Sequence, residues 1–186
     1  AFKNFAAGKG IWGSDWVGFD QFTKFFSSYQ FDRLISNTLI LSVMQLAICF
    51  PFPILLALML NQVTHKKYKK IVQTVTYAPH FISVVVLVGM LSLFLSPNTG
   101  IVNTVIRNLG GEPIHFMGDA KYFRELYVIS NMWQHMGWGS IIFLAALSGV
   151  NPELYEAARI DGCTRLKLIR HIDIPSILPT IVIVLI

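Results

Sequence analysis

Long apolar stretches without any charged side chain set the pattern of this chain. Asp, Glu, Lys and Arg are absent from residues 38–60, 71–95 and 126–150, and a further apolar stretch covers 174–186. A helix needs about 20 apolar residues to cross a hydrocarbon core roughly 30 Å thick. The pattern therefore predicts an all-α membrane protein, a polytopic helical bundle with three complete spans and a fourth, truncated span at 174–186.

The composition supports a membrane location. Hydrophobic residues make up 54% of the 186 residues and charged residues only 13%, whereas soluble domains carry roughly 25% charged residues. Three buried helices of a soluble protein are the less favoured alternative. Because the sequence begins without methionine and ends inside an apolar stretch, we expect it to be a fragment of a longer chain.

The basic residues predict how the chain is oriented. Cytoplasmic loops are enriched in Lys and Arg, and segment 61–70 contains four lysines, while 151–173 contains three arginines and a lysine. Both segments are expected on the cytoplasmic side. Segments 96–125 and 1–37 are then expected outside, although 1–37 carries basic residues of its own. This bias accounts for the net charge of +5, so a nucleic-acid partner is not expected.

Polar residues interrupt the third apolar stretch. Asn131, Gln134 and Trp138 fall on one helical face, and His135 adjoins it. Polar side chains are costly in hydrocarbon, so this face is expected to point into the bundle. There it would either form hydrogen bonds between helices or line a substrate pathway.

Prolines interrupt the first two apolar stretches, at Pro51, Pro53 and Pro79. Each proline removes one backbone hydrogen bond, so each is expected to kink its helix. Neighbouring helices or water would then have to satisfy the freed backbone groups.

The segment 151–175 carries a strong set of helix start and stop signals. Asn151 suits the N-cap position and Pro152 the first helical position, whereas Gly162 suits a left-handed residue after the helix. Thr164 is expected to cap a second helix, which Pro175 is expected to stop. These signals alone are compatible with an ordinary helical hairpin between two spans.

The same segment resembles the EAA loop of permease subunits from ATP-binding-cassette importers. In that pattern, Glu-Ala-Ala is followed by Asp-Gly and then by an apolar run that ends in two prolines four residues apart. The matching residues are Glu156, Ala157, Ala158, Asp161, Gly162, Ile172, Pro175 and Pro179. Departures from the family pattern occur at Cys163, Ile169 and Ile174, where side chains of similar bulk stand in.

The resemblance implies a fold, a role and a set of partners. The fold would be that of a type I importer permease, with core 38–186 and an EAA-like coupling loop at 151–175, in a bacterial plasma (inner) membrane as a multi-pass protein. The partners would be a second permease subunit, an ATPase dimer, an extracytoplasmic solute-binding protein and the sugar substrate. The coupling residues would be Glu156, Ala157, Ala158, Asp161 and Gly162. Glu156 would contact the ATPase, and Gly162 would permit the turn that Asp161 braces.

The segment 1–37 is expected to be an extracytoplasmic loop with an aromatic-rich helix. Phe19, Phe22 and Phe26 repeat at helical spacing behind a possible Asp20 cap. The run at 11–26 resembles the segment after the first span in permeases for oligosaccharide or polysaccharide uptake by Gram-positive bacteria. Its rings would either anchor the helix at the membrane surface or contact the solute-binding protein.

The sequence carries no catalytic constellation. It lacks a GxxxxGK[ST] phosphate loop, so ATP would be hydrolysed by a separate subunit, and it lacks an HEXXH metal motif. No cofactor or metal is expected, and neither Cys49 nor Cys163 lies in a CxxC pair. A permease for a sugar is the favoured function. The alternatives are a permease for another solute and, from a different class, a membrane enzyme or assembly protein.

Overall fold

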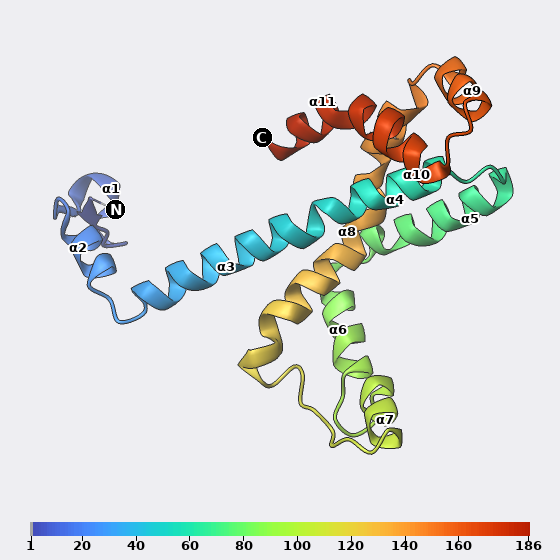
Figure 1. Ribbon diagram of the computed structural model, residues 1–186. Helices are drawn as coiled ribbons and strands as arrows, with labels where there is room; N and C mark the ends of the chain where they lie inside the picture. Colours follow the sequence, from blue (N-terminus) through green and yellow to red (C-terminus); the bar gives the residue numbers. More distant parts are fainter. Residues whose placement is uncertain (1) are drawn as a thin grey trace. The chain divides into compact units, whose positions relative to one another are not determined.

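The computed structural model describes residues 2–186, nearly all of its regular structure is helical, and it forms two compact units (Figure 1). The first unit extends to Val43, and the second runs from Met44 to Ile186. Each unit is described by itself.

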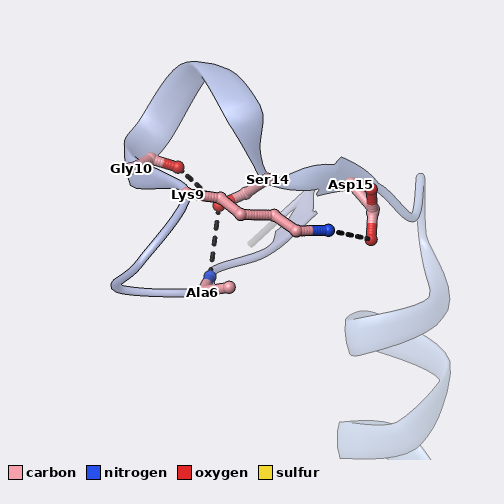
Figure 2. A network of polar contacts seen from close by, with 5 residues as sticks. All are labelled: Ala6, Lys9, Gly10, Ser14 and Asp15. Atoms are coloured by element: carbon pink, nitrogen blue, oxygen red, sulfur yellow. Dashed lines mark hydrogen bonds and ion pairs between the residues drawn. The ribbon is translucent and has the colours of Figure 1, made fainter.

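The first unit begins with a small polar motif that the all-helical prediction did not include. Strands β1 (Lys3–Asn4) and β2 (Asp15–Trp16) pair antiparallel, with the short helix α1 (Gly10–Gly13) between them. Figure 2 shows why this connection closes: the buried Ser14 hydroxyl donates to the Gly10 carbonyl at 2.5 Å and accepts from the Ala6 amide at 3.1 Å.

Aromatic rings cover this motif and continue into helix α2 (Asp20–Phe26). The Phe2 ring stacks on Trp16 at a centroid distance of 5.6 Å and meets Phe22 at 5.3 Å. The predicted helix of the aromatic segment is therefore confirmed. The predicted Asp20 cap is wrong, because Asp20 is the first helical residue and Phe19 occupies the N-cap position without a side-chain hydrogen bond.

The first long apolar helix starts earlier than the charge-free stretch. Helix α3 covers Phe31–Cys49 and α4 covers Pro51–Asn61, so residues 31–37 are helical rather than part of a loop. Pro51 lies in the first turn of α4, where its missing N–H costs no hydrogen bond. Together 31–61 form one helix that is long and apolar enough to span a membrane.

The second apolar stretch is divided by a sharp bend. Helix α5 (Lys66–Tyr77) and the 3₁₀ turn η1 (Ala78–Phe81) are separated from α6 (Val84–Phe94) by a bend of 103°. Pro79 lies within η1, and Ser83 caps α6 by accepting a hydrogen bond from the Val86 amide at 3.3 Å. One continuous span was expected over 71–95. The structure instead has a bent pair of helices there, because α6 begins within this stretch.

A buried asparagine organises the connection after α6. Asn103 of helix α7 (Ile101–Asn108) is fully buried, and its side-chain amide donates to the carbonyls of Leu95, Ser96 and Ile114 at 3.0 to 3.1 Å. The side-chain oxygen of Asn103 accepts a hydrogen bond from the Ile114 backbone amide at 2.7 Å. A 3₁₀ turn, η2 (Ala120–Tyr122), then leads into the next helix.

Helix α8 (Phe123–Ser148) is the centre of the second unit, because α4, α5, η1 and α11 all pack against it. The chain ends with α9 (Pro152–Ile160), α10 (Arg165–Leu168), the π-helical turn η3 (Ile169–Asp173) and α11 (Ile174–Leu185). The hydrophobic core lies where α4, α8 and α11 meet. It consists of Ala57, Leu58, Phe143, Leu147 and Ile177.

One expectation about the end of the chain is wrong, and a second is confirmed only in part. Pro175 does not stop the helix that begins at Arg165, which continues to Leu185 as a helix long and apolar enough to span a membrane. The π turn before Pro175 alters the hydrogen-bond register there, and proline is tolerated in the first turn of α11. Thr164 occupies the N-cap position, but its side chain makes no capping hydrogen bond.

Many large apolar side chains in these helices are exposed, including Val85 at 82% and Ile183 at 72%. Such surfaces are typical of contact with lipid or a partner subunit. Within residues 2–186, two helices are long and apolar enough to cross a membrane, and three if the bent pair forms one span. Helix α8, with its polar central residues, is not among them.

A glycine sets the close approach of α5 and α8. A Cβ atom at Gly137 would overlap the backbone carbonyl of Thr76, which cannot rotate away as a side chain would. We therefore expect Gly137→Ala to lower the stability of the protein in detergent by about 1–3 kcal/mol, the usual cost of overpacking. The measurement is thermal unfolding followed by circular dichroism.

The matched control is Gly89→Ala in α6, where an added Cβ meets no atom within 4 Å. Alanine favours a helix interior over glycine by about 1 kcal/mol, so the control should be at least as stable as the parent. Equal stability of both variants would contradict the close contact of α5 and α8.

Candidate coupling loop and polar face

Helix α9 has the predicted start. The Asn151 side-chain oxygen accepts a hydrogen bond from the Glu153 amide at 3.0 Å, and Pro152 occupies the first helical position. The Glu153 carboxylate in turn accepts from the Asn151 side-chain amide at 3.2 Å, in the turn where the helix dipole favours negative charge. The N-cap prediction is confirmed.

The end of α9 is a Schellman turn. Gly162 has a φ of +76°, in the left-handed region that favours glycine. The Cys163 amide donates to the Ala158 carbonyl at 2.9 Å, and the Gly162 amide donates to the Arg159 carbonyl at 3.0 Å. Both ends of this nine-residue helix are therefore closed by local hydrogen bonds, which gives it a defined shape even at the surface.

The five predicted coupling residues lie on α9 or directly after it, and most of them are exposed. Glu156, Ala157, Asp161 and Gly162 are exposed, and Ala158 is half-buried. Apolar side chains beside them are also open to solvent: Leu154 is 52% exposed, Ile160 86% and Leu166 78%. The loop thus presents a short helix with small and apolar residues and a few charges, a surface suited to a protein partner.

The inward side of α9 is held by a group of four polar residues that the sequence analysis missed. The Asp173 carboxylate, 0% exposed, accepts hydrogen bonds from the Tyr155 hydroxyl at 2.5 Å and from the side-chain amides of Asn61 at 3.1 Å and Gln62 at 2.7 Å. Burial and the neighbouring Asp173 raise the pKa of Tyr155 to about 12, so its hydroxyl keeps its proton at neutral pH and donates. We call these residues the Asp173 cluster.

Asn61 also begins the lysine-rich segment 61–70. Because it donates to Asp173, and at 3.2 Å to the Tyr155 hydroxyl, this segment and 151–173 lie at the same end of the second unit. In Figure 1, α9 lies near the ends of α4 and α5. This geometry agrees with the shared cytoplasmic side that their basic residues indicate.

A second polar region lies along α8. Gln134 is buried and donates to the Ile82 carbonyl at 2.7 Å, where the chain bends between η1 and α6. His135 and Trp138 are exposed, Asn131 is half-buried, and the Nδ1 atom of His135 lies 3.0 Å from the Asn131 carbonyl. Gln134 therefore connects two elements, while its neighbours remain open.

His80 joins these residues from η1. Its ring stacks on Trp138 with a centroid distance of 4.7 Å and an angle of 3°, and it meets the His135 ring edge-on at 5.4 Å. Its Nδ1 atom is buried without a hydrogen-bond partner among the described residues. Nothing local in the sequence shows that η1 packs against α8, so His80 could not be assigned to this face from the sequence alone.

Among residues 2–186, no three His, Cys, Asp or Glu side chains come close enough together to hold a metal ion. The second unit thus has two candidate functional regions. One is the surface helix α9, which is anchored by the buried Asp173 carboxylate, and the other is the face of α8 with its aromatic and imidazole rings. The signal for the missed anchor was an aspartate between two isoleucines, at a position where an apolar helix face was expected.

Relatives of this chain include transport system permease proteins. It is 45% identical over 186 residues to Protein LplB and to the polygalacturonan/rhamnogalacturonan transport system permease protein YteP, both of Bacillus subtilis (strain 168). Each match covers 100% of this chain and 58% of the relative, so the chain spans well under two thirds of their length.

A solved structure is also similar. The chain matches part of a bacterial ABC transporter involved in the import of the acidic polysaccharide alginate, with a TM-score of 0.88 and 48% identity, over 91% of this chain and 59% of that one. The chain also matches a bacterial alginate ABC transporter in complex with an alginate pentasaccharide-bound periplasmic protein, with a TM-score of 0.87 and 48% identity, over 90% of this chain and 58% of that one.

The sequence also matches the family described as binding-protein-dependent transport system inner membrane component, over residues 35–186. This match includes the capped helix, the Gly162 turn and the polar face of α8. The chain belongs to the family of inner membrane components of binding-protein-dependent transport systems.

Proposed function

We propose that this chain is part of a permease subunit that forms half of the translocation pathway of an ATP-driven sugar importer. The observation that carries the proposal is the coupling loop: a short helix closed at both ends, exposed along its motif residues and placed at the basic end of the second unit. Such a helix can transmit force without melting, because its terminal hydrogen bonds are made locally.

The partner at this loop would be a separate ATPase dimer on the cytoplasmic side. Ala157 and Ala158 allow close approach, while Leu154 and Ile160 offer apolar contacts that would be buried on docking. Glu156 is exposed and would make a polar contact at the edge of the interface. The exposed apolar faces of the longer helices would contact lipid and a second permease subunit in a multi-pass arrangement in the bacterial plasma membrane.

The transported solute would be an oligosaccharide or polysaccharide delivered by an extracytoplasmic binding protein. Two relatives bear on this: the permease YteP is named for polygalacturonan and rhamnogalacturonan, and the similar solved transporter imports alginate. In this chain, Trp138 stacked on His80 and bordered by His135 offers an aromatic platform of the kind that binds sugar faces. Gln134 would hold that platform in place, and Asn131 would border it.

The first test concerns the turn. Gly162→Val puts a β-branched residue at a φ of +76°, where such residues are strained. A Cβ atom there meets nothing within 4 Å, so any effect comes from the backbone. We expect the assembled transporter to lose stimulation of ATP hydrolysis by sugar-loaded binding protein.

Gly162→Asn is the matched control, because asparagine tolerates the left-handed region far better than valine. It should keep most of the stimulation, while both variants insert into the membrane in equal amounts. Normal stimulation of the valine variant would contradict the coupling role of the turn.

The second test concerns the aromatic platform. Trp138→Ala should lower sugar uptake at subsaturating concentration by about two- to tenfold, the range that 0.5–1.5 kcal/mol of aromatic contact corresponds to. ATP hydrolysis without sugar should not change. The measurement is uptake of radiolabelled oligosaccharide into proteoliposomes.

Trp133→Ala serves as the control, since Trp133 lies on the same helix and is 39% exposed but does not belong to the stacked rings. It should transport at the parental rate. If both tryptophan variants transport normally, the platform does not contact the sugar.

A further inference from the structure

The Asp173 cluster joins three separate segments of the chain. Tyr155 comes from α9, Asn61 is the last residue of α4, Gln62 follows it as the C-cap, and Asp173 ends the π turn η3. Both carboxylate oxygens are used: Oδ1 accepts from Tyr155 and Asn61, and Oδ2 accepts from Gln62.

Helix α9 has little else to hold it. None of its residues is fully buried, and only Tyr155 and Ala158 are half-buried. Hydrophobic burial therefore contributes little to the orientation of α9. The hydrogen bonds between the Tyr155 hydroxyl, Asp173 and Asn61 are consequently the main directional contacts between this helix and the rest of the second unit.

The chemistry of the cluster makes its geometry strict. A buried carboxylate is costly unless hydrogen bonds compensate it, and here three neutral donors do so, without any ion pair to Asp173 among residues 2–186. Neutral donors must point at the carboxylate oxygens to be effective. A displacement of α9 alone would break the Tyr155 bond and leave a buried charge undersatisfied.

The π turn explains how Asp173 reaches this position. The fully or nearly buried residues of the last long helix are Leu168, Asp173 and Ile177. The first two are five residues apart, a spacing that an i→i+5 turn brings onto one face, and the last two are four apart, as in an α-helix. Asp173 and the core residue Ile177 thus lie on the same side of one continuous helix.

We propose that Asp173 is the positioning residue that ties the coupling helix to α4 and α11, so that a displacement of α9 moves both helices with it. This role rests on the proposed function, in which an ATPase displaces α9. The core formed by Ala57, Leu58 and Ile177 already joins α4 to α11. The Asp173 cluster adds α9 to that rigid group.

The experiment uses the assembled transporter, in which this chain is combined with its partner permease, ATPase subunits and binding protein in proteoliposomes. The variants are Asp173→Leu, which removes both acceptor oxygens from a side chain of similar shape, and Tyr155→Phe, which removes the hydroxyl that reaches Asp173. We expect each to assemble and to hydrolyse ATP, but to transport about tenfold less sugar per ATP, the scale of a typical coupling free energy.

A conservative variant separates positioning from simple destabilisation. Asp173→Asn keeps one oxygen for Tyr155 and Asn61, and its amide can donate to Gln62 when the Gln62 amide is turned over. It should therefore keep most of the sugar-to-ATP ratio. Tyr68→Phe is the matched control, because Tyr68 is 58% exposed on α5 and lies outside the cluster. Normal coupling in Asp173→Leu and Tyr155→Phe, or equal losses in Asp173→Asn and Asp173→Leu, would overturn the proposal.

A distance measurement reads the attachment directly. Spin labels at the exposed positions Ile160 of α9 and Met59 of α4 should give a narrow distance distribution, in a background where both native cysteines are serine. Tyr155→Phe should broaden it, whereas Tyr68→Phe should not. An unchanged distribution in Tyr155→Phe would show that other contacts orient α9.

Failure of this inference can be told apart from failure of the proposed function. If the chain does not couple to an ATPase at all, the parent transporter shows no stimulation and Gly162→Val has nothing to abolish. If only the role of Asp173 is wrong, the parent is coupled, Gly162→Val is uncoupled, and Asp173→Leu and Tyr155→Phe transport like the parent.

Discussion

Buried polar side chains must find hydrogen-bond partners inside the protein, because a buried polar group without a partner is costly, and these pairings determine how the elements meet. Asp173, Gln134 and Asn103 are each buried, and each makes its hydrogen bonds to a segment at least seven residues away. These bonds are directional, whereas apolar contacts are not. They fix which end of one element meets which part of another, and the apolar side chains then fill the space between.

This constraint separates the chain into parts with different mechanical properties. Helix α9 is stiff because its two ends are closed locally, and it meets the rest of the second unit mainly through the Asp173 cluster. The core of α4, α8 and α11 is held by close apolar packing. A partner that moves α9 would therefore act on the core through a small number of hydrogen bonds. The polar face of α8, which is tied to the bend at Ile82 through Gln134, would respond to such a movement.

Local signals in the sequence predicted local structure well. The Asn151 cap and the left-handed Gly162 both depend on residues within one turn, and both are confirmed. Pro175 misled the prediction, since its effect depends on the π turn that precedes it. The family resemblance, read from the same segment, is confirmed by the family match over residues 35–186.

Non-local pairs could not be predicted in this way. Asp173 lies more than a hundred residues from Asn61 and Gln62, and no pattern within either segment indicates the other. The same holds for His80 and Trp138, which meet because η1 packs against α8. Roles of Glu156, Ala157, Ala158 and Asp161 stay predictions, because they concern a partner rather than this chain alone.

Docking of α9 on an ATPase can be observed by site-specific cross-linking in the assembled transporter. A single cysteine at the exposed position Ala157, in a chain without Cys49 and Cys163, would carry a short cross-linker in the assembled transporter. We expect a cross-linked product with the ATPase subunit, and none from a cysteine at Trp12, which is 94% exposed in the segment expected outside the membrane. Absence of the Ala157 product in a transporter that is active before cross-linking would show that α9 does not dock on the ATPase.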